Sequence, residues 1–148
     1  MKWFLIFLSV ILTFTLSAEV ISGPDAPGSV NNSGGNFVNS TYSTDISLHT
    51  DINWTMNWGE SGNLETADRI RIRYRIDGGA WTTVVSQNGD ICAGGGACAL
   101  LTTGDAGIEG DLLEVRVRAR NDKNNEFWLW DALTVSGTPI PLPVEFEQ

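Results

Sequence analysis

Histidine and cysteine are scarce in this 148-residue sequence, which contains one of the first and two of the second. His49 has no evident serine or cysteine nucleophile, and the Gly-x-Ser-x-Gly turn of serine hydrolases is absent. The Glu-x-Asp-x-x-Glu run that places the two acids of sandwich glucanases on one strand is absent as well. These absences argue against an enzyme and leave a sandwich-fold glycoside hydrolase as the less favoured alternative.

The two cysteines, Cys92 and Cys98, enclose a short glycine-rich segment. In an exported chain, such a close pair predicts a disulfide, which in a loop this short contributes roughly 2–2.5 kcal/mol. A metal site would need more histidine or cysteine partners, and a redox-active pair is usually spaced more closely. We therefore predict a local disulfide on a loop.

Long apolar runs are absent except at the start of the chain. Lys2 precedes an uncharged apolar stretch that ends at Leu16, and the small residues Ser17 and Ala18 follow. This pattern predicts a cleaved signal peptide over residues 1–18. The stretch is shorter than the roughly 20 residues that span a bilayer, so we expect a secreted or cell-surface protein without membrane insertion after cleavage.

Basic residues are few, since nine lysines and arginines stand against 18 acidic residues, a formal net charge of −9. Such an acidic chain is not expected to bind nucleic acid or anionic lipid over its whole surface. The arginines are nevertheless concentrated in two stretches, 69–75 and 116–120. A local basic strip is therefore compatible with the acidic balance.

Helical periodicity is also absent after the signal peptide. Residues 69–76 alternate between arginine and an apolar or aromatic residue, and residues 112–120 repeat the alternation. This pattern is typical of β-strands with one wet and one buried face. Asp77-Gly78-Gly79 predicts a hairpin turn into a return strand over 80–85. Short strands, polar turns and long loops together predict an all-β, jelly-roll type antiparallel β-sandwich.

The sequence divides into four predicted parts. Residues 1–18 form the signal peptide, and residues 19–45 form a Gly/Pro/Asn-rich leader with one edge strand near Phe37 and Val38. Residues 46–137 form the sandwich, and residues 138–148 form a proline-rich tail or linker.

Several segments resemble a jelly-roll module of secreted Bacteroidetes proteins, which is similar to lectin-like, carbohydrate-binding and MAM-type sandwiches. The tail motif Leu-Pro-Val-Glu is similar to a linker that often precedes a type IX secretion sorting domain; the alternative is a simple stiff tail. The resemblance implies a noncatalytic role in glycan binding or cell adhesion. The competing interpretation is a structural or matrix protein that assembles through its sheet faces. The resembling segments are 58–65, 68–81, 113–117 and 126–137.

The arginine-bearing strands are the first candidate site. If they lie in one sheet, their guanidinium groups share one face and could bind the carboxylates or sulfates of an acidic polysaccharide or cell-surface glycan. The alternative is an ordinary charged outer face, neutralised by acids such as Glu114 and Asp51. The candidate ligand-binding arginines are Arg71, Arg73, Arg116 and Arg118.

Two tryptophans are the second candidate. Phe127 and Leu129 share a parity with later apolar residues and are expected in the core, which leaves Trp128 and Trp130 on the opposite face, able to stack on sugars. The alternative is that they pack under loops or against arginines. Trp81 is expected to be a core residue.

The resemblance also implies a metal site, because jelly-roll modules often hold a structural Ca²⁺ near strand ends. The residues at such positions are Glu65, Asp68 and Asp131. Calcium needs six to eight oxygen ligands, so these acids are not sufficient alone. The alternative is that Asp131 accepts backbone hydrogen bonds and Asp68 caps a turn.

Overall fold

The computed structural model describes residues 17–22, 28–31, 33–92, 99–131 and 133–142. The apolar part of the predicted signal peptide and residues 143–148 of the tail lie outside these ranges. No helix within the ranges is long and apolar enough to cross a membrane. The strands are β1 (Glu19–Ser22), β2 (Gly28–Asn31), β3 (Val38–Asp45), β4 (His49–Ser61), β5 (Arg69–Ile76), β6 (Thr82–Asn88), β7 (Leu101–Ile108), β8 (Leu112–Arg120), β9 (Phe127–Trp130) and β10 (Thr134–Pro139).

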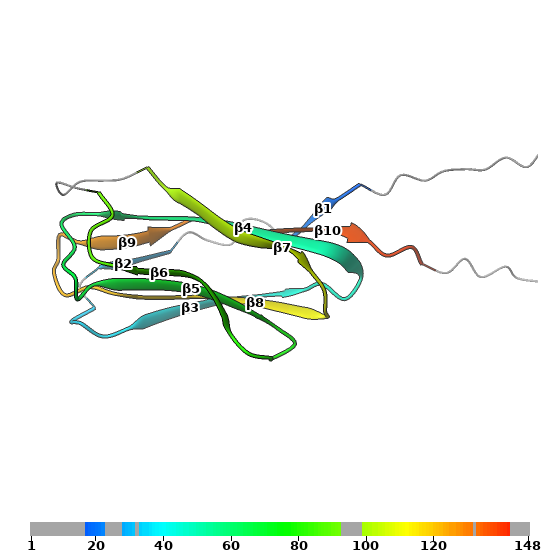
Figure 1. Cartoon of the computed structure of the whole chain (residues 1–148), viewed down its shortest axis with the longest axis horizontal. Coiled ribbons are helices and arrows are strands. Elements are labelled where there is room, and N and C mark those ends of the chain that lie inside the picture. The colour runs from blue at the N-terminus through cyan, green and yellow to red at the C-terminus, as the bar shows by residue number, and fades with distance from the viewer. Residues whose placement is uncertain (1–16, 23–27, 32, 93–98, 132, 143–148) are drawn as a thin grey trace, which may run out of the picture.

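The strands form two antiparallel sheets stacked as a sandwich (Figure 1). One sheet has the order β1-β10-β4-β9-β2 with β7 on the other edge of β4, and the second has the order β3-β8-β5-β6. Strands pair from the ends of the chain inwards: β1 with β10, β2 with β9, β3 with β8, β4 with β7, and β5 with β6. A long hairpin wrapped into two sheets in this way is a jelly roll, so the predicted fold is confirmed.

The buried faces of β5 and β8 lie at the centre of the core. Ile70 and Ile72 of β5, and Val115 and Val117 of β8, have no exposed surface. These residues occupy every second position, because successive side chains of a strand point to opposite faces. Both strands have the bounds that the alternation of charge and hydrophobicity predicts.

The segment 19–45 contributes more to the sandwich than predicted. It forms β1, β2 and β3 rather than a leader with one edge strand, so the sandwich runs from Glu19 to Pro139 instead of 46–137. The edge strand near Val38 is present, because β3 begins there and lies at the edge of its sheet. The short strands β1 and β2 carry little local signal and form by pairing with β10 and β9, more than 90 residues away in the sequence.

The prediction that Trp128 and Trp130 are exposed is wrong. Their exposed fractions are 0% and 3%, and both belong to the core. Both β9 and β10 pair with the same edge of β4, with Trp130 opposite Trp58 and Thr134 opposite Thr55. Trp130 and Thr134 are four residues apart, whereas their partners on β4, Trp58 and Thr55, are three residues apart. This one-residue offset in pairing reverses the parity between β9 and β10, so the parity of the buried residues in β10 does not apply to β9.

Candidate functional site

All seven arginines of the chain lie on the outer face of the four-stranded sheet, which we call the arginine face. In the antiparallel pairing of β5 with β8, three pairs of arginines lie directly opposite each other. These pairs are Arg69 with Arg120, Arg71 with Arg118, and Arg73 with Arg116, and Arg75 lies opposite Glu114. The four arginines predicted to bind ligand thus form two adjacent pairs, about 6.7 Å apart along the strands.

Two aromatic rings hold the guanidinium groups in place. Trp81 lies beneath the guanidinium groups of Arg75 and Arg116, whose central carbons are 4.6 and 4.3 Å from its ring centroid. The central guanidinium carbon of Arg118 likewise lies 4.3 Å from the ring centroid of Phe37. Such cation–π contacts order long side chains. Trp81 precedes β6 and is half-buried on this face, so the prediction that it is a core residue is wrong.

The positive charge of the arginine face is largely uncompensated within the described part of the chain. One carboxylate there pairs with an arginine: Glu114 accepts hydrogen bonds from Arg75 at 2.6 and 2.9 Å. Asp51, considered as a second neutralising acid, lies on β4 in the other sheet. Burial, together with the charges of its arginine neighbours, lowers the pKa of the Arg73 guanidinium. The arginine face is therefore suited to binding a polyanion.

Short polar side chains border the arginine face on both sides. Thr41 of β3 lies opposite Arg116, and its hydroxyl accepts a hydrogen bond from the Arg116 Nε at 3.3 Å. On the other side, Ser86 of β6 lies opposite Arg71. No hydrogen bond or ion pair joins the Arg71 side chain to another described residue. The arginine face thus has polar side chains able to form hydrogen bonds along both of its borders.

The predicted metal ligands separate into two places. Glu65 and Asp68, in the connection between β4 and β5, meet two acids from the connection between β8 and β9. We call these four residues the acidic cluster; their ligand oxygens all lie within 4.8 Å of one another. Asp131 does not belong to it. The members of the acidic cluster are Glu65, Asp68, Asp122 and Glu126.

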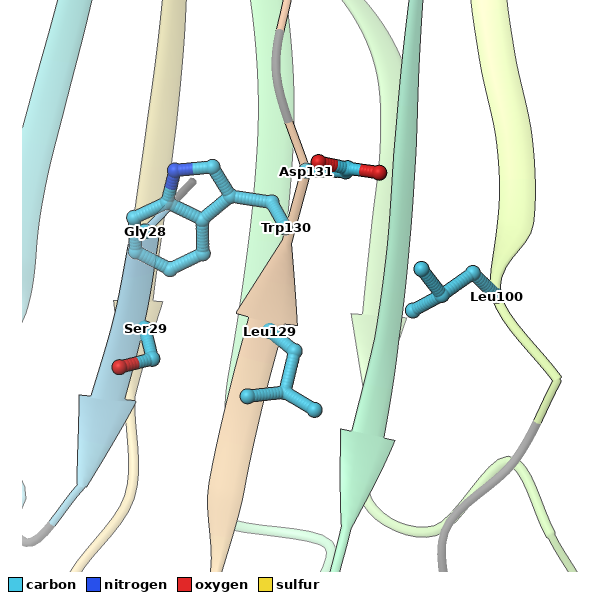
Figure 2. Close-up of a pocket in the computed structure, with 6 residues that line it drawn as sticks. All are labelled: Gly28, Ser29, Leu100, Leu129, Trp130 and Asp131. Atoms are coloured by element: carbon cyan, nitrogen blue, oxygen red, sulfur yellow. The ribbon is translucent and has the colours of Figure 1, made fainter. Parts of the chain in front are cut away.

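Asp131 instead lines a pocket of about 390 Å³ beside β2 and β9 (Figure 2). Gly28 packs against the face of the Trp130 indole, where a Cβ atom would lie 2.1 Å from the ring. The indole extends towards Gly28, whereas the Asp131 carboxylate extends away from it (Figure 2). Among the described residues of the lining, Asp131 is the one titratable group, so they provide no second carboxylate for an acid–base pair.

Glu60 was not singled out from the sequence, although it anchors the segment that carries Cys92. Its buried carboxylate accepts hydrogen bonds from the backbone N–H groups of Ile91 and Cys92, at 2.7 and 2.9 Å. Burial raises the pKa of the Glu60 carboxyl. Cys92 is disulfide-bonded. Its predicted partner, Cys98, lies outside the described residues.

No protein-family model matches this chain, and no curated protein matches it significantly. Among solved structures, one similar chain comes from the structure of the infectious bursal disease virus Gx strain. The similarity covers 84% of this chain and 32% of the viral chain, with 12% sequence identity and a TM-score of 0.42. The chain thus corresponds in length to about a third of that viral chain.

Proposed function

We propose that this protein is a noncatalytic, extracellular glycan-binding module whose arginine face binds an acidic polysaccharide. The observation that supports the proposal best is the set of three arginine pairs lying directly opposite each other. Like charges at opposed positions of a sheet are destabilising, so an ordinary outer face would alternate signs across its strands. An anionic ligand would convert this repulsion into attraction.

The geometry favours an extended polymer over a single small anion. Three pairs at steps of about 6.7 Å offer forked donors over roughly 13 Å along the strands. Repeating sulfate or carboxylate groups could contact successive pairs, and the polar side chains of β3 and β6 could accept and donate hydrogen bonds to sugar hydroxyls. The rings of Trp81 and Phe37 are already covered by guanidinium groups, so their role here is to position arginines rather than to stack on sugars.

Arg71→Gln combined with Arg118→Gln is expected to weaken binding of a heparin oligosaccharide or polyuronate by roughly 10–100-fold, as two charge-assisted contacts are lost. Because the change also removes a repulsive pair, the melting temperature should stay constant or rise. Titration calorimetry at low ionic strength measures the loss of polyanion binding, with an uncharged glucan as the control ligand that should not bind. A thermal melt measures the change in melting temperature.

Arg75→Gln is the matched control, because Arg75 is already neutralised by Glu114. It should change binding far less than the double variant while lowering the melting temperature slightly. The proposal fails if the wild-type protein binds neither polyanion, or if the double variant binds as tightly as wild type. Equal affinity for single-stranded DNA would make this a general polyanion surface and overturn the glycan assignment. Light scattering tests the rival matrix role, which predicts concentration-dependent assembly without ligand.

A further inference from the structure

We propose that the acidic cluster is a binding site for one divalent cation of the hard, oxygen-preferring class, with Ca²⁺ as the expected ion. The cluster joins two segments that are distant in sequence. The pairing of Arg69 with Arg120 brings the end of the β4–β5 connection beside the start of the β8–β9 connection. Acids from both connections therefore converge at one end of the four-stranded sheet.

The decisive observation is a buried carboxylate oxygen without a partner, which belongs to a member of the cluster. Glu126 is 1% exposed, and its Oε2 atom has no hydrogen-bond partner among the described residues. Leaving a buried charged acceptor without a partner is costly. Asp68, 2% exposed, is the second buried acid of the cluster. A cation between these carboxylates would satisfy the orphaned oxygen.

The charges within the cluster also call for a cation. Four carboxylates this close together cannot all be ionised without compensation. The half-exposed ammonium of Lys123 contacts Glu65 and lies 3.4 Å from Glu126, so it compensates one charge of four. Lys123 thus acts as a tethered cation that a metal ion would displace.

The donor set distinguishes among metals. All four ligands are carboxylates, without the histidine or cysteine that zinc prefers. Ligands on opposite sides of Ca²⁺ are about 4.6–5.2 Å apart, so the 4.8 Å limit of the cluster fits its coordination sphere. Mg²⁺ requires shorter distances and retains several waters. Two hydrogen bonds of 2.8 Å already shape one half of the site: the Asp68 backbone N–H donates to the Glu65 carbonyl, and the Asp68 Oδ2 accepts from the Glu65 backbone N–H.

Titration of the purified, chelator-treated protein with CaCl₂ tests the site. We expect saturable binding of one ion per chain and a rise of several degrees in melting temperature, with a smaller response to MgCl₂ at matched ionic strength. Glu126→Gln should abolish most of the Ca²⁺-dependent rise. Asp122→Asn, on the exposed side of the cluster, should weaken Ca²⁺ binding at least tenfold. This variant tests the site even if Glu126→Gln prevents folding.

Two further variants separate a metal site from a merely crowded group of acids. Asp131→Asn removes a carboxylate that lies outside the cluster and should leave Ca²⁺ binding unchanged. Lys123→Gln removes the tethered cation, so it should tighten Ca²⁺ binding several-fold while lowering the melting temperature of the metal-free protein. Absence of saturable binding, or equal loss in the Asp131 and Asp122 variants, would overturn the proposal. None of these measurements involves a glycan, so they stand apart from the test of the arginine face.

Discussion

Trp128→Ala is expected to lower the free energy of unfolding by about 3–5 kcal/mol, the loss typical of truncating a fully buried tryptophan. Trp128 has no exposed surface and lies between β2 and β4, opposite Val30 and Glu60. Its indole N–H donates a 3.1 Å hydrogen bond to the carbonyl of Arg120 at the end of β8. Alanine would leave a cavity between the sheets and an unpaired carbonyl. Since domains are stable by only about 5–15 kcal/mol, the variant should be marginally folded.

Urea denaturation measures this loss, and a thermal melt should fall by about 10–20 °C. Phe127→Ala is the matched control, because Phe127 is half-buried on the other face of the same strand and should cost far less. Trp128→Phe retains a ring but leaves the Arg120 carbonyl without its donor, so an intermediate loss is expected. If Trp128→Ala instead weakened glycan binding at unchanged stability, the tryptophan would be the exposed ligand-stacking residue that the sequence pattern predicts.

The alternation of residue types predicts the central strands well because their environment is uniform. Along β5 and β8 one face is buried and the other solvated from end to end, so charge and hydrophobicity alternate without interruption. The predicted condition for a binding surface, that Arg116 and Arg118 lie beside the arginines of β5, is met by the pairing of these strands. Pairing itself is not visible in either stretch alone, because register depends on the whole sheet.

Prediction fails where a local irregularity decides which way a side chain points. The pairings of β9 and β10 with β4 are offset by one residue, and a parity count from one strand to the other places both tryptophans on the wrong face. Trp81 is misplaced for a related reason: the return strand starts at Thr82, two residues later than predicted, so Trp81 precedes the strand and its ring lies against the arginines. Both errors concern tryptophans, whose high hydrophobicity suits a core and a ligand surface equally.

The acidic cluster illustrates a different limit. Glu65 and Asp68 are close in sequence, whereas Asp122 lies in a segment that reads as a polar turn and Glu126 reads as the start of the last strand. The geometry of antiparallel pairing could have identified them. When two antiparallel strands pair, the residues just before the first strand lie next to the residues just after the second strand. With β5 and β8 paired, Asp68 must therefore lie near the start of the β8–β9 connection. Asp131, which follows a different strand, has no such reason to be there.

Asn121→Ala is expected to lower the free energy of unfolding by about 3–5 kcal/mol, because it leaves several buried polar groups without partners. Asn121 is fully buried, and its amide nitrogen donates to the carbonyls of Val30, at 3.0 Å, and of Glu126. Its amide oxygen accepts from the backbone N–H of Ser33 at 3.3 Å. One side chain thus ties β2 and the turn after it to the connection that carries half of the acidic cluster.

Urea denaturation in chelator compares this variant with Asn125→Ala, an exposed substitution expected to change stability by less than about 0.5 kcal/mol. Asn121→Asp separates the roles of the two amide atoms. It keeps the acceptor for Ser33, but its carboxylate faces two carbonyl oxygens, so its folded-state pKa should be raised. Stability should then be highest below the unfolded pKa of about 4 and should fall as the pH rises through the folded pKa. If Asn121→Ala unfolded like wild type, the amide could not be what holds the β8–β9 connection, and the geometry of the acidic cluster would have to depend on its own charges.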